Sequence, residues 1–310
     1  NNFETIFTII KKISKKNNPQ ILDIGSNDGS FLEIVKRKYP KILGIEPTNT
    51  AKISISKGIN TIKKPLNFKL AKKIVNKYSK FDFVIATNFF AQTNRLNEIL
   101  QSVKLILNNE GLLIVEVQYL YDLLFQKGFD SFHHEHIAYY TASSITKLLK
   151  KYKLYVFDAE KLQVHGGMLR VFISLQQKPI SKKLKKILSE ENDKNIINKI
   201  KNLNLFRIKF NNRLEKLLVK LKKQKQKIYG IGAAPRACVM LNSCNLTKNE
   251  IDLVGEVPQS LKCNKYVPGT NIIVKNENKI IKDKPDYVII LAWHLEKMII
   301  NLLLKKRYKG

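Results

Sequence analysis

A chain of 310 residues with a hydrophobic fraction of 44% is long enough for two domains with real cores. We expect no secretory signal and no membrane span, because no apolar run approaches the roughly 18 residues that cross a bilayer. Three cysteines without a CxxC pair exclude a four-cysteine zinc site within the chain and favour a reducing cytoplasm. The formal charge of +31 would suit nucleic acid, but only seven of the 56 basic residues are arginine, so we expect a compositional charge and no nucleic-acid partner.

The first elements predict a strand, a glycine loop, a helix and a second strand. Apolar residues at helical spacing predict a helix at 3–14. Short apolar strands are expected at 21–24 and 42–46. The loop at 25–29 and the helix at 31–38 separate these strands. Such a loop lets the backbone turn sharply and approach a ligand closely.

Two cofactor classes compete for this loop. A dinucleotide-binding loop usually carries Gly-x-Gly-x-x-Gly, whereas here Asp23 opens the pattern Asp-Ile-Gly-x-x-x-Gly, which looks like the first motif of S-adenosylmethionine (SAM) methyltransferases. Glu46 ends the second strand, where a carboxylate can accept hydrogen bonds from ribose hydroxyls. A glycine turn without a ligand is the third and least favoured interpretation.

The alternation of helices and strands continues through the first half of the chain. Helices are expected at 69–78 and 96–107, and strands at 81–86 and 112–117. This order predicts a doubly wound parallel sheet, whose ligands bind beyond the carboxyl ends of the strands. Four polar residues fall at such ends, namely Asp23, Glu46, Asn88 and Gln118.

A histidine cluster follows, on a loop after the 112–117 strand. Three of the five histidines of the chain lie at His133, His134 and His136, with Glu135 between them. A metal site, an acid–base site, a pH switch and a loop of mutually satisfied polar groups are all open interpretations. Zinc is disfavoured, because these three positions do not share a helix face. Further along, His165 precedes a Gly-Gly turn and is an additional candidate.

The remaining sequence predicts a helical connector and a second α/β unit. Residues 181–227 are rich in lysine and carry apolar residues at three- and four-residue steps, which indicates one long amphipathic helix or a helix pair. Strands are then expected at 227–230, 251–254 and 287–292, a helix that starts at 238–241, and a closing helix at 294–304. The turn at Gly232, with Arg236 beside it, is either a phosphate site or a plain turn. We therefore expect domains at 1–178 and 227–310, joined by a connector at 179–226.

Taken together, the motifs resemble one family, the SAM-dependent sugar C-methyltransferases that act on nucleotide-linked deoxysugars. The matching stretches run in order over nearly the whole chain: ILDIGSNDGSFL (21–32), GIEPT (44–48), FDFVIATNFFA (81–91), FDSFHHEHIAYY (129–140), HGGMLRV (165–171), YGIGAAPRACVMLN (229–242), KYVPGT (265–270) and PDYVIILAWH (285–294).

The resemblance implies a Rossmann-like α/β methyltransferase domain, a helical connector and a smaller Rossmann-like α/β domain that binds the nucleotide-sugar. It implies SAM as cofactor, a small-molecule substrate and methyl transfer to a carbon next to a ketone. His136 would be the base, Glu135 would orient it or bind the sugar, and His133 and His165 would donate hydrogen bonds. The implied cofactor-binding residues are Asp23, Gly25, Ser26, Asn27, Gly29, Glu46, Pro47, Asn88 and Phe89. The implied substrate-binding residues are Gln118, Tyr140, Gly232, Arg236 and Tyr266, and no metal site is expected.

The chain departs from the family at several points. The family usually carries an N-terminal cysteine-rich zinc domain, which is absent from this sequence. His133 replaces a tyrosine, and Gln92 and Asn271 stand where histidines are common. Three further functions stay open beside the first: related small-molecule O- or C-methylation, RNA methylation, and a non-catalytic remnant that binds SAM or nucleotides.

Overall fold

The computed structural model describes residues 2–164, 166–191, 195–306 and 308. The chain divides into two compact units, which are described separately. The first unit is Asn1–Asp122 with Glu135–Lys194, and the second is Leu123–His134 with Asn195–Gly310.

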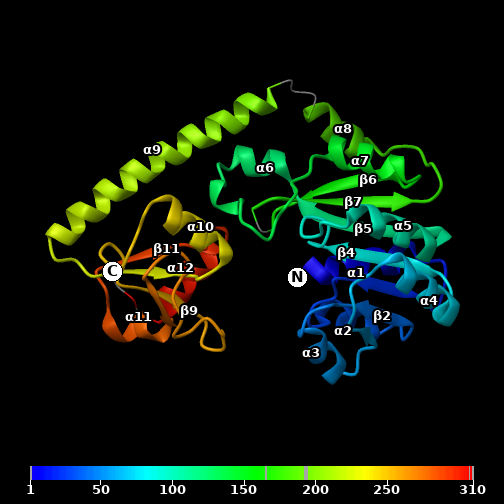
Figure 1. The fold of residues 1–310 in the computed structure, drawn as a ribbon, viewed down its shortest axis with the longest axis horizontal. Helices are drawn as coiled ribbons and strands as arrows, with labels where there is room; N and C mark the ends of the chain where they lie inside the picture. The colour runs from blue at the N-terminus through cyan, green and yellow to red at the C-terminus, as the bar shows by residue number, and fades with distance from the viewer. Residues whose placement is uncertain (1, 165, 192–194, 307, 309–310) are drawn as a thin grey trace. The chain divides into compact units, whose positions relative to one another are not determined.

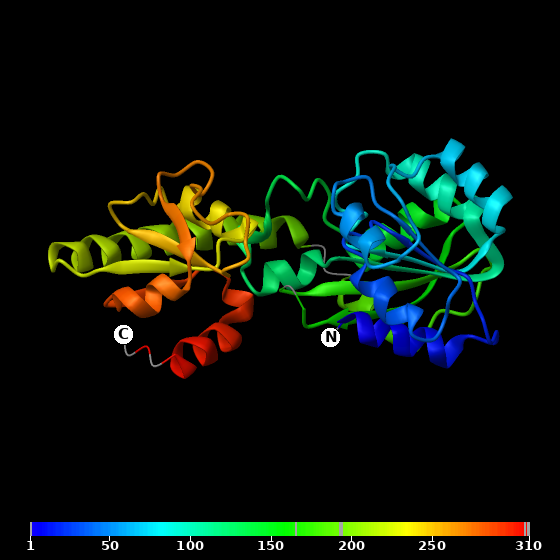
Figure 2. The same cartoon turned by 90° about the horizontal axis from the view of Figure 1, so that it is seen from below.

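The first unit is built on a seven-stranded sheet, with strand order β3-β2-β1-β4-β5-β7-β6 (Figures 1 and 2). The first five strands of this order, from β3 through β2, β1 and β4 to β5, are parallel. Strand β7 runs antiparallel to both of its neighbours, β5 and β6. Strands β1 and β2 are short apolar runs buried along their whole length, as a sheet covered on both sides requires. The strands are β1 (Ile21–Ile24), β2 (Ile42–Ile45), β3 (Thr61–Ile62), β4 (Phe81–Thr87), β5 (Leu107–Gln118), β6 (Tyr155–Leu162) and β7 (Met168–Ser174).

Helices cover both faces of this sheet. One face buries apolar residues of α4, α5, α7 and α8, and the other buries those of α1 and α2. Polar caps set several helix starts: the Asn67 side chain accepts from the N–H of Leu70, and Thr141 forms a capping box with Ser144. The helices are α1 (Asn2–Ile13), α2 (Ser30–Lys36), α3 (Ala51–Ser56), α4 (Phe68–Tyr78), α5 (Leu96–Ile106), α6 (Leu120–Phe125), α7 (Ala142–Lys151) and α8 (Lys182–Glu190).

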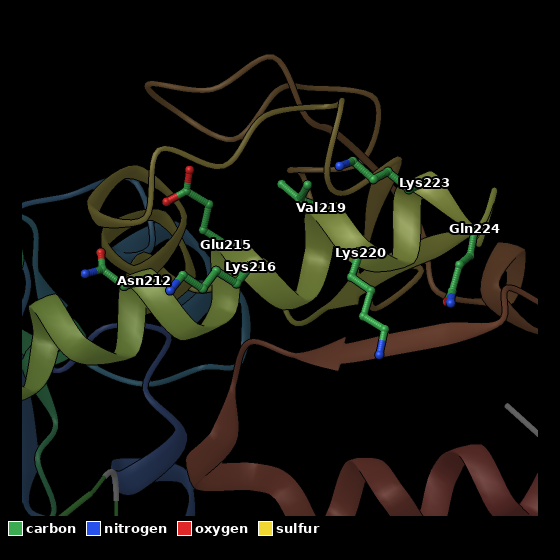
Figure 3. Close-up of a pocket in the computed structure, with 7 residues that line it drawn as sticks. All are labelled: Asn212, Glu215, Lys216, Val219, Lys220, Lys223 and Gln224. Atoms are coloured by element: carbon green, nitrogen blue, oxygen red, sulfur yellow. The ribbon is translucent and has the colours of Figure 1, made fainter.

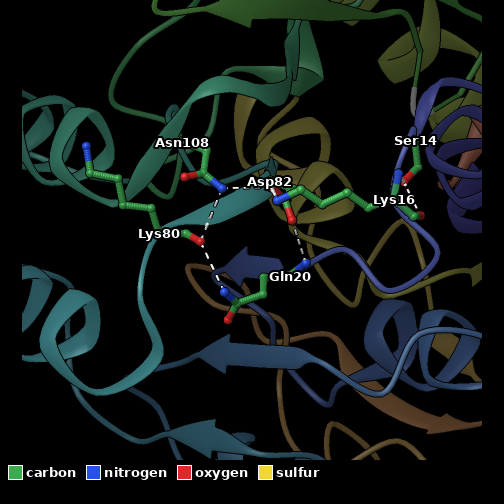
Figure 4. A network of polar contacts seen from close by, with 6 residues as sticks. All are labelled: Ser14, Lys16, Gln20, Lys80, Asp82 and Asn108. Carbon is green, nitrogen blue, oxygen red and sulfur yellow. Dashed lines mark hydrogen bonds and ion pairs between the residues drawn. The ribbon is translucent and has the colours of Figure 1, made fainter.

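A polar network ties together the strand starts at the amino edge of the sheet (Figure 4). The carboxylate of Asp82 accepts from the backbone N–H of Gln20 at 3.0 Å, from Nδ2 of Asn108 at 2.7 Å and from Nζ of Lys16 at 2.6 Å. The carbonyl of Lys80 accepts from the side-chain amides of Gln20 and Asn108. The starts of β1, β4 and β5 are therefore bonded through one side chain.

The second unit is a smaller three-layer α/β structure. Its sheet is parallel throughout, with order β10-β9-β8-β11. One face packs against α9 and α10, and the other against α11 and α12. The elements are α9 (Ile196–Lys223), β8 (Ile228–Ile231), α10 (Pro235–Ser243), β9 (Leu253–Glu256), β10 (Ile273–Asn276), α11 (Asn278–Asp283), β11 (Tyr287–Ile290), η2 (Trp293–Leu295) and α12 (Glu296–Lys305).

The expected fold class is confirmed: a Rossmann-like α/β unit is followed by helices and a second α/β unit. The lysine-rich segment forms a helix pair, α8 and α9. The predicted parallel arrangement of the strands at 21–24, 42–46, 81–86 and 112–117 is confirmed, and β7 adds an antiparallel strand between β5 and β6. None of the described helices combines the length and the apolar character needed to cross a membrane. The predicted domain boundaries stay a prediction.

Candidate active site

The glycine loop after β1 has a backbone that few side chains tolerate. Gly25 and Gly29 have φ values of 75° and 77°, in the left-handed region, and Asn27 also has a positive φ of 51°. A Cβ on Gly25 would lie 3.1 Å from Cδ2 of Phe89, and one on Gly29 would lie 2.5 Å from Oγ of Ser54. Both glycines are therefore needed for the loop to turn against its neighbours.

The carboxylate of Glu46 holds this loop to the end of β2. Its Oε2 accepts from the backbone N–H of Asn27 at 3.1 Å, and its Oε1 accepts from the N–H of Thr48 at 2.8 Å. The residue is buried. Each carboxylate oxygen can accept more than one hydrogen bond, so capacity remains for ligand hydroxyls. Pro47, the next residue, is exposed.

Two buried polar atoms beside the loop have no hydrogen-bond partner in the described part of the chain: Oδ1 of Asp23 and Oγ of Ser26. Burial, and to a lesser extent the charge of Glu46, raises the pKa of Asp23 to about 8. A buried acceptor without a donor costs free energy, which a donor or cation on a bound ligand would offset. These groups fit SAM, whose amino group and ribose hydroxyls can donate hydrogen bonds.

The loop after β4 completes this edge of the first sheet. Asn88 adopts a positive φ of 57°, and its backbone N–H donates to the carbonyl of Glu116 on β5 at 3.0 Å. This turn directs the chain so that the half-buried ring of Phe89 lies against Gly25. Of the nine residues predicted to bind the cofactor, the structure thus ties Asn27 to Glu46 and sets Gly25 against Phe89.

Two predicted substrate residues of the first unit, Gln118 and Tyr140, make hydrogen bonds to backbone carbonyls. Nε2 of Gln118 donates to the carbonyl of Gly167 at 2.9 Å, and the hydroxyl of Tyr140 donates to the carbonyl of Phe90 at 3.1 Å. Both residues are buried. In this structure the two side chains brace the loops at the carboxyl edge, and their predicted contact with substrate stays a prediction.

The histidine stretch is divided between the two units. His133 and His134 belong with the second unit, and Glu135 and His136 with the first. The N–H of Ile137 donates to the carbonyl of Ala91 at 2.9 Å, and the rings of His136 and Tyr139 are 5.8 Å apart at an angle of 66°. His136 is therefore held beside the loop that follows β4. His165 lies outside the described residues.

No metal centre emerges from the described residues, where no group of three or more His, Cys, Asp or Glu side chains has a suitable arrangement.

In the second unit, Gly232 has a φ of 92°, and its N–H donates to the carbonyl of Gly255 at 2.8 Å. A Cβ there would lie 2.7 Å from that of Ala292. Tyr266 is 62% exposed and bridges to Ile273.

Arg236 is buried near the start of α10 rather than exposed beside the Gly232 turn. Its guanidinium lies over the ring of Trp293, 5.0 Å from the centroid, and hydrogen-bonds to the hydroxyl of Ser131. Asp130 and Trp293, which are joined by a hydrogen bond, surround the same group. These two residues were not singled out from the sequence, although Trp293 is the only tryptophan and lies in one of the motif stretches.

Two grooves on the protein surface lie away from these motif residues. A groove of about 680 Å³ follows α9 and is lined by Asn212, Glu215, Lys216, Val219, Lys220, Lys223 and Gln224 (Figure 3). Another, of about 910 Å³, opens at the amino edge of the first sheet and includes Asp82 and Asn108. Neither groove contains a predicted site residue.

Both halves of the chain are similar to known protein families. Residues 1–158 match a family model described as a methyltransferase domain, and residues 163–310 match one described as a C-methyltransferase C-terminal domain. The chain is 26% identical over 297 residues to C-methyltransferase NovU of Streptomyces niveus, a match that covers 94% of this chain and 70% of the relative.

Similar solved structures match part of the chain. The PH0226 protein of Pyrococcus horikoshii OT3 shares 17% identity with a TM-score of 0.44, over 56% of this chain and 89% of that one. A SAM-dependent methyltransferase of Thermotoga maritima, described as a possible histamine N-methyltransferase, shares 15% identity with a TM-score of 0.41, over 56% of this chain and 89% of that one.

Proposed function

The chain belongs to the SAM-dependent C-methyltransferase family, and we propose that it methylates a carbon next to a ketone in a nucleotide-linked deoxysugar. The family comparisons support methyl transfer to carbon. The nucleotide-sugar class is a proposal that rests on the motif stretches along both units, including the Gly232 turn at the carboxyl end of β8.

The observation that carries the proposal is the hydrogen bond between the N–H of Ile137 and the carbonyl of Ala91. It fixes His136 beside the loop after β4, and Phe89 in that loop lies against Gly25 of the glycine loop. This bond supports a location of the proposed base near the carboxyl edge of the first sheet, where Asp23 and Ser26 have buried oxygens without partners among the described residues. A titratable base next to the cofactor loop is the arrangement that carbon methylation needs.

In the proposed reaction, a ring nitrogen of His136 accepts the proton from the substrate carbon next to the ketone. The C–H electron pair becomes that of an enolate, and the new C–C bond forms from it. Bound SAM would supply the electrophilic methyl group of its sulfonium, whose S–CH3 bond would break as the C–C bond forms, with the electron pair staying on sulfur as a neutral thioether. Imidazole is the side-chain group used most often as a general base, so it suits the removal of this proton. Glu135 is proposed to orient the base.

Other site residues keep their predicted roles. Asp23, Ser26, Asn27 and Glu46 are proposed to hold the cofactor, with Gly25 and Gly29 shaping the loop and Pro47, Asn88 and Phe89 bordering it. Gln118, Tyr140, Gly232, Arg236 and Tyr266 are the proposed substrate residues. His133 and His165 stay predicted hydrogen-bond donors to the developing oxyanion.

The test is replacement of the proposed base. We expect His136→Asn to lower methyl transfer from radiolabelled SAM to a nucleotide 4-keto-deoxysugar by about 10²- to 10⁴-fold, the usual contribution of a general base. The SAM dissociation constant, measured by calorimetry, stays unchanged, because His136 is not assigned to the cofactor. His134→Asn, an exposed histidine two residues away, is the matched control. Wild-type turnover in His136→Asn would rule out the base assignment.

A further inference from the structure

A twelve-residue segment of the chain, Leu123–His134, belongs to the second unit although residues of the first unit flank it on both sides. It begins within α6, contains the short helix η1 (Phe129–Ser131), and leads directly into Glu135 and His136. Whatever holds this segment therefore also holds one end of the stretch that carries the proposed base.

Aromatic packing holds one side of the segment. The ring of Phe129 lies 6.4 Å from that of Phe206 and 5.5 Å from that of Phe210, both on α9. The ammonium of Lys127 lies 4.9 Å from the centroid of the Phe206 ring. Pairs of rings at these separations stabilise by about 0.5–1.5 kcal/mol beyond the area they bury.

A polar cluster holds the other side. Oδ2 of Asp130 accepts from Nε1 of Trp293 at 2.7 Å, across 163 residues of sequence. Arg236 covers the Trp293 ring and hydrogen-bonds to Ser131, the residue after Asp130. Asp130 is 3% exposed, and burial raises its pKa, an effect that Arg236 and Trp293 oppose. Burying a carboxyl group costs free energy unless hydrogen-bond partners compensate for the lost water. Removing either partner of Asp130 would therefore destabilise this arrangement.

The positions of the two partners give the cluster a functional meaning. Arg236 follows β8 by five residues, and Trp293 follows β11 by three. Both therefore come from loops or helix starts at the carboxyl edge of the second sheet, where ligands of such sheets bind. The same edge contains the Gly232 turn, which belongs to the proposed nucleotide-sugar site.

We propose that Asp130, Arg236 and Trp293 form a latch that fixes the Leu123–His134 segment to the second unit, and that they act as positioning residues for the proposed base. The assignment of the base rests on the proposed function, whereas the latch itself does not. Loss of the latch leaves the chain able to fold, because the Phe129 contacts remain, but releases one end of the histidine stretch. Misplacing a catalytic group by about 1 Å lowers a rate by about 100-fold.

The single tryptophan makes the latch directly measurable in the full chain. We expect acrylamide quenching of Trp293 fluorescence to rise by about twofold or more in Asp130→Ala, because the indole loses its buried partner. Asp130→Asn keeps a carbonyl acceptor and restores most of the protection. Glu215→Ala removes an exposed carboxylate from the same unit and is the matched control that leaves quenching unchanged.

The positioning role is tested on the same variants. We expect kcat of Asp130→Ala to fall by about 10- to 100-fold, with an unchanged SAM dissociation constant, and to recover in Asp130→Asn. Unchanged quenching in Asp130→Ala overturns the latch. Raised quenching with wild-type kcat overturns the positioning role. A wild-type protein that methylates no keto-sugar refutes the proposed function, and the quenching result then decides the latch by itself.

Discussion

The backbone N–H of Asn27 donates a 3.1 Å hydrogen bond to Oε2 of Glu46, joining the glycine loop to the end of the neighbouring strand. Glu46 therefore shapes the loop, and we propose that its carboxylate also accepts hydrogen bonds from the cofactor. We expect Glu46→Ala to weaken SAM binding by about 10- to 100-fold, the effect of losing a charge-assisted hydrogen bond. Isothermal titration calorimetry measures this change. Glu110→Ala, which removes an exposed carboxylate at the opposite edge, should bind SAM as the wild type does; equal affinity in both variants would remove Glu46 from the site.

The buried carboxyl of Asp23 predicts a pH dependence of stability. Its pKa is raised from 3.8 to about 8 in the folded protein, so the folded state keeps a proton that the unfolded chain has already lost in this window. The stability that this proton binding contributes is fully present below the pKa of the unfolded chain. It is lost as pH rises toward the pKa of the folded protein. Asp23→Asn stays neutral throughout. As pH rises between these two pKa values, the free energy of unfolding of Asp23→Asn should therefore increase relative to that of the wild type. The expected increase is on the order of 1 kcal/mol per pH unit.

Urea unfolding of wild type and Asp23→Asn at about pH 5 and about pH 7.5 measures the effect. Comparing the two proteins at each pH cancels the contributions of the other titrating groups. A stability difference that is the same at both pH values would mean that Asp23 is ionised in the folded protein.

Gly29 and Gly58 form a natural pair for testing the loop. Both have positive φ values, 77° and 69°, but a Cβ on Gly29 would lie 2.7 Å from Cδ1 of Ile59, whereas one on Gly58 would meet only Nζ of Lys36 at 3.4 Å. Backbone strain alone should make Gly58→Ala cost about 1–2 kcal/mol. Gly29→Ala adds a steric clash and should cost about 2–4 kcal/mol and also weaken SAM binding. Denaturant unfolding compares the two, and equal losses would exclude close packing as the reason for Gly29.

Asp82 is expected to stabilise the amino edge of the first sheet. Its carboxylate accepts from Gln20, Asn108 and Lys16, and its side chain is 14% exposed. Asp82→Ala should lower the free energy of unfolding by about 1–3 kcal/mol, because donors are left without their acceptor. Lys16→Ala should cost less than about 1 kcal/mol, since its side chain is 61% exposed. Chemical denaturation of both variants ranks them, and a larger loss for Lys16→Ala would contradict the network.

Much of the first unit could be predicted because its signals are contiguous. The strand at 21–24 coincides with β1, and the predicted 3–14 helix corresponds to α1. The Asp-Ile-Gly-x-x-x-Gly pattern predicted a loop whose glycines indeed have positive φ values. These features follow from periodicity and backbone preference within a few residues, which the sequence displays directly.

Other features went unpredicted because their signals were weak or short. The helix α10 begins at Pro235, three residues before the predicted start, because proline suits the first turn of a helix. The strand β5 begins at Leu107, where the sequence predicted the end of a helix and a loop. Pairing between Leu107 and Phe81 of β4 supplies the hydrogen bonds that local propensity did not indicate.

The sequence by itself determined the class of the fold, the glycine loop with Glu46 at the end of the second strand, and the position of the histidine stretch, because each depends on neighbouring residues. Only the tertiary structure decided that β7 inserts antiparallel beside β5, and that burial raises the pKa of Asp23 well above its usual range. It also decided that the Leu123–His134 segment joins the second unit through Asp130 and Trp293. Burial and hydrogen-bond partners arise from residues far apart in the chain, and no local pattern records which of them will meet.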